Sequence, residues 1–115
     1  MTEELKSNII ETMQSMHKQI GETVKIDDWI CTSGNHYDRH QTRFSKYLIK
    51  IQDFYIRTSG AIATIYNENQ QIEFRTDSIN KIEKTENEII LEINMTDNVW
   101  RKLKISKTNP VDNIV

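Results

Sequence analysis

Residues that could do chemistry gather in one short stretch, from residue 35 to residue 47. It holds two arginines, one lysine, two of the three histidines and three aromatic rings, with Asp38 as its only acid. The whole chain has a formal net charge of −2, so the sign of the charge reverses locally here. Positive charge interleaved with rings suits phosphate groups, unstacked bases or an acidic protein surface. We therefore expect a recognition site, with these contact residues: Tyr37, Arg39, His40, Arg43, Phe44 and Lys46.

The same stretch is a poor candidate for catalysis. Cys31 could pair with His36 or His40, but it follows Trp29 and Ile30 in an apolar run, where cysteines are usually inert packing residues. The two histidines are four residues apart, which could suit a metal on a helix, although histidines in a polar loop are more often solvated. The three glycines are too scattered for a nucleotide-binding loop. We expect a protein that is not an enzyme and that uses no cofactor and no metal.

A second charged region offers an alternative contact surface. Residues 67–98 carry eight acids against three basic residues, whereas residues 100–107 carry four basic residues and no acid. The acids could imitate phosphates toward a basic nucleic-acid channel, but charge at alternate strand positions also arises simply because those positions face water. The acidic contact residues would be Glu83, Glu86 and Glu88. The sequence leaves open whether the basic or the acidic region makes the contact.

The elements that must position these residues are one helix followed by short strands. Apolar residues at three- and four-residue steps predict an amphipathic helix over residues 2–20, namely Leu5, Ile9, Met13, Met16 and Ile20. From residue 23 to residue 105 the period changes to two, which predicts six or seven antiparallel strands. Residues 29–32 either continue the first strand or form a second strand after a break at Asp27 and Asp28. The expected fold class is α+β, with the helix packed on a curled antiparallel sheet or small barrel.

The predicted organisation is a single domain over residues 1–107 with a loosely held tail at residues 108–115. Its one long irregular segment is the loop over residues 33–45, and a loop of this length in a compact meander is usually functional or mobile. A meander also leaves edge strands exposed, and such edges could pair across a two-fold axis to form a homodimer.

The composition also bears on the compartment. There is no apolar run near the roughly 20 residues that a membrane helix needs, and the acidic N-terminus lacks the pattern of a signal peptide. The lone Cys31 agrees with a reducing compartment. We expect a cytoplasmic protein that does not contact membranes.

One segment resembles a known family. Trp29, Thr32 and Ser33, then Tyr37, then the run from Phe44 to Lys50, form a pattern similar to a stretch of some small phage-encoded inhibitors of type II CRISPR nucleases. The resemblance spans residues 28–50 of the 115 and implies a phage or mobile-element anti-defence protein. It assigns no residue a role.

Together these features favour a small binding protein that blocks a nucleic-acid-handling protein partner by surface contact. Direct nucleic-acid binding through residues 35–47 is the alternative. A peptide- or lipid-binding module is a third reading, because the pleckstrin-homology fold is also a curled sheet with one helix. In that fold, however, the helix lies at the C-terminus.

Overall fold

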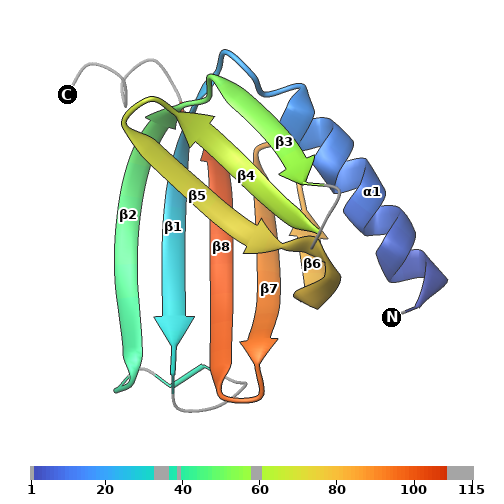
Figure 1. Ribbon diagram of the computed structural model, residues 1–115, viewed down its shortest axis with the longest axis vertical. Helices are drawn as coiled ribbons and strands as arrows, with labels where there is room; N and C mark the ends of the chain where they lie inside the picture. Colours follow the sequence, from blue (N-terminus) through green and yellow to red (C-terminus); the bar gives the residue numbers. More distant parts are fainter. Residues whose placement is uncertain (1, 33–36, 39, 58–60, 109–115) are drawn as a thin grey trace.

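The computed structural model describes residues 2–32, 37–38, 40–57 and 61–108, which form one α-helix and two antiparallel sheets (Figure 1). The elements are α1 (Glu3–His17), β1 (Thr23–Cys31), β2 (Thr42–Lys50), β3 (Asp53–Arg57), β4 (Ile62–Asn67), β5 (Gln70–Arg75), a 3₁₀ turn η1 (Thr76–Ser78), β6 (Ile79–Lys84), β7 (Glu88–Thr96) and β8 (Val99–Lys107). The α+β class is confirmed. The described residues hold eight strands instead of six or seven, and no barrel forms because β3, β4 and β5 pair only with one another.

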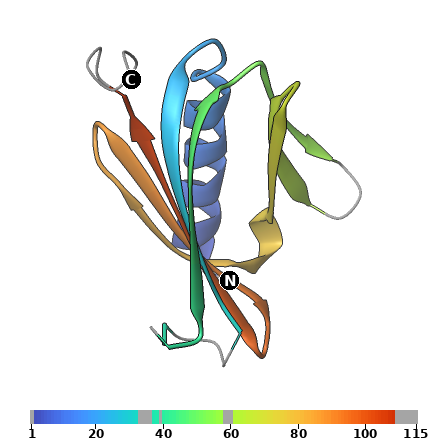
Figure 2. The same cartoon turned by 90° about the vertical axis from the view of Figure 1, so that its left-hand side faces the viewer.

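The two sheets lie face to face. The five-stranded sheet has the order β2-β1-β8-β7-β6 and the three-stranded sheet the order β3-β4-β5. Figure 2 shows α1 and the three-stranded sheet on the same side of the five-stranded sheet. We call this covered side of the five-stranded sheet its inner face and the opposite side its outer face. No described helix or strand lies against the outer face.

Helix α1 begins where the sequence predicts and ends earlier. The Thr2 hydroxyl caps it by accepting a hydrogen bond from the Leu5 amide at 3.1 Å. The helix ends at His17, three residues before the predicted boundary, and the chain then turns through Gly21 with a φ of 94°. It buries Ile9, Met13 and Met16 and contacts the edge strands β3 and β6. In the described part of the chain, no helix combines the length and apolar character needed to cross a membrane.

The hydrophobic core lies between the two sheets and α1. Alternate positions of each strand point into it, and Ile26, Ile65, Leu91 and Leu103 are fully buried there. This alternation fixes the other set of positions on the outer face. A residue's place in the strand therefore decides whether it belongs to the core or is available to a ligand.

A buried ion pair lies on the inner face of the five-stranded sheet, and its arginine also reaches the three-stranded sheet. Arg101 donates from Nε and Nη2 to the two carboxylate oxygens of Asp28, both at 3.0 Å, and from Nη1 to the Glu73 carbonyl at 2.6 Å. Of the two alternatives for residues 29–32, continuation of the first strand is confirmed, because β1 runs through Asp27 and Asp28 without a break. Asp28 points inward to Arg101, while Asp27 faces outward, opposite Lys46 and Lys104 in the strand register.

The predicted long loop is shorter than expected. Strand β2 begins at Thr42, so residues 42–45 are strand and not loop. The long strand β1 supplies the pairing partner for this extension, with Cys31 opposite Thr42. The Thr42 hydroxyl donates to the Asp38 carbonyl, which ties the described part of the loop to the start of β2. Residues 33–36 and the tail 109–115 lie outside the described residues, and the hydroxyl of Thr108 donates to the Thr23 carbonyl at 2.9 Å.

Candidate functional site

Aromatic rings and lysines meet on the outer face of the five-stranded sheet. The register places Trp29 of β1 between Phe44 of β2 and Lys102 of β8. The Trp29 and Phe44 rings have centroids 5.0 Å apart, and the Lys102 Nζ lies 5.3 Å from the Trp29 centroid. The Lys46 Nζ lies 6.0 Å from the Phe44 centroid. We call Trp29, Tyr37, Phe44, Lys46 and Lys102 the ring–lysine surface.

These groups are accessible, and Lys46 and Lys102 form no close ion pair with any described residue. Phe44 is 49% exposed and Tyr37 is 55% exposed, whereas Trp29 is half-buried. Among the described residues, no carboxylate lies within 4 Å of the ammonium group of Lys46 or Lys102. The surface therefore offers exposed rings beside two lysines without a close ion pair among the described residues, although Asp27 lies opposite Lys46 and Glu92 opposite Lys102 in the strand register.

Tyr37 extends this surface toward the N-terminal end of β8. Its ring meets the Trp100 ring edge-on, with centroids 5.8 Å apart. Trp100 itself is buried, and its indole Nε1 donates to a Glu92 oxygen at 3.3 Å. Trp100 is therefore a support for Tyr37 and does not present a ring face to a ligand.

The structure divides the predicted basic site. Tyr37, Phe44 and Lys46 come together on the outer face as one group. Arg43 is exposed, but it precedes Phe44 in β2 and takes the opposite side of the strand, across from Ile30. His40 is exposed in the turn before β2, where its backbone amide donates to Asp38 at 2.9 Å. Arg39 lies outside the described residues.

Two members of the ring–lysine surface were missed by the sequence reasoning. Trp29 and Lys102 were not among the contact residues predicted from the sequence. Each is near Phe44 only because β1 pairs with β2 on one side and with β8 on the other. Since β8 is far from β1 in the sequence, local charge and ring content gave no signal for this arrangement.

The predicted acidic contact face is largely matched by lysines. Glu88 binds Lys104 at 2.9 Å, and Glu83 binds Lys81 at 3.1 Å. The hydrogen bond that Lys104 donates to Glu88 raises the pKa of Lys104, and the one that Lys81 donates to Glu83 raises the pKa of Lys81. Lys81 also lies 3.7 Å from Glu92. We call these residues, on β6, β7 and the adjoining part of β8, the acid-paired half of the outer face.

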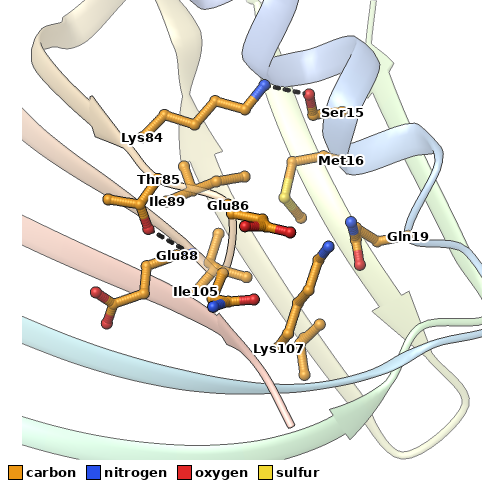
Figure 3. A pocket seen from close by; sticks show the side chains of 12 residues that line it. Ser15, Met16, Gln19, Lys84, Thr85, Glu86, Glu88, Ile89, Ile105 and Lys107 are labelled. Atoms are coloured by element: carbon orange, nitrogen blue, oxygen red, sulfur yellow. Dashed lines mark hydrogen bonds between the residues drawn. The ribbon is translucent and has the colours of Figure 1, made fainter.

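The third predicted acid, Glu86, lies in the turn after β6, at a small pocket that Glu88 also lines (Figure 3). The pocket has a volume of about 170 Å³ and opens between α1 and the turn that joins β6 to β7. Its floor is apolar, with Met16 and Ile105, and its rim includes Lys84, whose ammonium donates to the Ser15 hydroxyl at 2.5 Å. Because its rim carries both signs of charge, the pocket does not form a continuous acidic surface with Glu83.

No arrangement typical of a metal centre is present in the described part of the chain. A group of three or more histidine, cysteine or carboxylate side chains able to hold a metal ion is not found there. Cys31 is buried, and its Sγ lies 3.8 Å from the Asp38 carbonyl oxygen. With no such centre among the described residues, the candidate site is the ring–lysine surface on the outer face.

Comparison with protein-family models, with curated proteins and with solved structures finds no match to this chain.

Proposed function

We propose that this protein is a non-enzymatic binding module that holds single-stranded nucleic acid on its ring–lysine surface. The observation that carries the proposal is the placement of the exposed Phe44 ring on the same face as Lys46 and Lys102, neither of which forms an ion pair within 4 Å among the described residues. An unpaired base can stack on such a ring, while ammonium groups bind the flanking phosphates. Rings on a sheet face with lysines between them supply both contacts at once.

The exposed rings favour a single strand over a duplex. In a duplex the base faces are already stacked on one another, so Phe44 and Tyr37 would have nothing to stack on. The span from β2 across β1 to β8 is about 10 Å from the usual strand spacing. This distance is comparable with the separation between a stacked base and a neighbouring phosphate.

A second candidate function is inhibition of a nucleic-acid-handling protein, as expected of a phage or mobile-element protein. The observation that favours it is Leu48, which is 45% exposed on the same strand as Phe44. An aliphatic side chain adds apolar area that suits a protein partner better than a phosphate backbone. Phosphate imitation by the acidic residues has weaker support, because Glu83 and Glu88 are bound to lysines.

Fluorescence anisotropy with labelled oligonucleotides tests the proposal. We expect binding of single strands of about 12 nucleotides at about 50 mM salt, weaker binding of the matching duplex, and affinity that falls as salt rises. Phe44→Ala should weaken binding, whereas Leu48→Ala should leave it unchanged.

Two results would separate the candidates. Absence of binding to any single-stranded DNA or RNA would overturn nucleic-acid recognition. If a protein captured from the host were then lost on Leu48→Ala as well as on Phe44→Ala, the same surface would be a protein interface.

A further inference from the structure

A second exposed apolar region lies away from the outer face, where α1 meets the edge of the three-stranded sheet. Ile10 of α1 is 59% exposed, and Tyr55 and Ile56 of β3 are 39% and 43% exposed. Next to them is a groove of about 630 Å³ between the helix and β3. Its lining includes Met13, Gln14 and His17 from the helix and Phe54, Tyr55 and Ile56 from the strand.

This groove opens onto an edge of β3 that has no strand beside it. Among the described elements, β3 pairs with β4 alone, so its other backbone edge has no sheet partner. Three consecutive β3 residues line the groove, and since their side chains alternate between faces, the groove must run along the strand edge. Extended chain is the natural occupant of such an edge.

Strand β3 lacks the lysines and bulges that mark two of the other edges. Edge strands usually avoid association through lysines, bulges or an element that covers them. Strand β2 carries Lys46 at its centre, and β6 has a register irregularity between Ile79 and Lys81. Helix α1 contacts both β6 and β3, and β5 has no lysine or register irregularity either. Strand β3 contains no lysine, proline or bulge.

The sequence of β3 is complementary to itself. In an antiparallel pair centred on Tyr55, Asp53 of one copy lies opposite Arg57 of the other, and Phe54 lies opposite Ile56. We propose that β3 pairs with β3 of a second copy in this register, which joins the two three-stranded sheets across a two-fold axis. The charges match twice because each copy supplies one acid and one arginine.

The side chains at the two ends of β3 are placed for this pairing. The Arg57 guanidinium binds Glu73 through Nη2 at 2.9 Å, which holds it over the sheet while its other donors stay available. Asp53 accepts the Phe54 amide with Oδ1 at 2.9 Å, so Oδ2 can accept from an arginine of the second copy. Association would also cover the exposed Ile56 and Ile10 side chains, whose burial favours it.

Charge exchange between copies tests the register. Sedimentation of the full chain should show a concentration-dependent dimer. Asp53→Arg and Arg57→Asp each place like charges opposite one another twice, and each should raise the dimer dissociation constant by at least about tenfold. An equal mixture of these two variants should dimerise again, because every opposed pair in the mixed dimer has opposite charges.

Controls keep the outcome clear. Circular dichroism should show unchanged secondary structure for both variants, and recovery in the mixture would itself show that both are folded. Arg75→Asp reverses a charge on β5, the other edge of the same sheet, and should leave dimerisation unchanged. The proposal is overturned by a wild-type protein that stays monomeric up to its solubility limit. It is also overturned if the mixture does not recover or if Arg75→Asp weakens the dimer equally.

Discussion

Strands β1 and β8 carry charge on both faces of one sheet, and the two faces differ in what surrounds that charge. On the inner face Arg101 is 8% exposed and donates to both oxygens of Asp28 and to a backbone carbonyl. On the outer face its neighbour Lys102 lies over Trp29, with no described carboxylate within 4 Å. The inner cation is committed to the fold, whereas the outer cation is available to a partner.

The largest expected effect is on the inner face. Arg101→Ala should lower the free energy of unfolding by about 3–5 kcal/mol, because it leaves the Asp28 carboxylate buried without a counter-charge. Urea denaturation measures the loss. Lys102→Ala, one residue away on the outer face, should change stability by less than about 0.5 kcal/mol.

Replacing both members of the buried ion pair tests whether the lost stability comes from the unpaired carboxylate. Replacing both members of the pair, as Asp28→Leu with Arg101→Met, should recover most of the lost stability, since apolar pairs of similar volume often match buried ion pairs. Similar urea midpoints for Arg101→Ala and Lys102→Ala would contradict the distinction between the two faces.

The next effect is on the outer face and concerns binding. Phe44→Ala should weaken single-strand binding by about 1–3 kcal/mol, the usual contribution of one stacked base. Its stability should change little by comparison with Arg101→Ala, because the ring is half exposed. Anisotropy titrations and urea denaturation of the same preparation measure binding and stability. If the loss of stability accounted for the loss of binding, stacking of a base on Phe44 would be contradicted.

Lys46 and Lys102 should each contribute to the salt dependence of single-strand affinity. Lys46→Gln and Lys102→Gln should each reduce the log–log slope of affinity against salt by about 1, as expected for one phosphate contact apiece. Lys104→Gln is the matched control, because the Lys104 ammonium is already bound to Glu88 at 2.9 Å. An equal change of slope for Lys104→Gln would show that the local counter-charge does not decide which lysines bind.

The smallest expected effect is in the acid-paired half. Glu83→Gln with Glu88→Gln should change single-strand affinity by no more than about threefold, in the direction of tighter binding, because two exposed negative charges are removed. Loss of all partner binding in this double variant, with Phe44→Ala still active, would instead make the acidic residues the contact surface.

The helix and the period-two strands could be predicted because their signals are local. The Thr2 cap and the three- and four-residue apolar steps are read within α1 itself. The division into two sheets could not be predicted, since it depends on β1 pairing with β8 across most of the chain. For the same reason the buried pair of Arg101 on β8 and Asp28 on β1 could not be predicted.

In the candidate site, too, only the residues that lie close together in the sequence could be predicted. Tyr37, Phe44 and Lys46 were found from their own segment, where rings and cations are dense. Trp29 and Lys102 join them only through the register of two neighbouring strands. Arg43 was predicted together with these residues, but strand alternation turns it to the other face.

The most direct test maps where a single strand binds. Isotope-labelled protein is titrated with a single-stranded oligonucleotide, and the backbone amide and tryptophan indole resonances are followed by NMR. We predict the largest shifts at the Trp29 indole and at the amides of Phe44, Lys46 and Lys102, with smaller shifts in β6 and β7. Shifts centred on Glu83 and Glu88, or no shifts at low salt, would contradict binding through the ring–lysine surface.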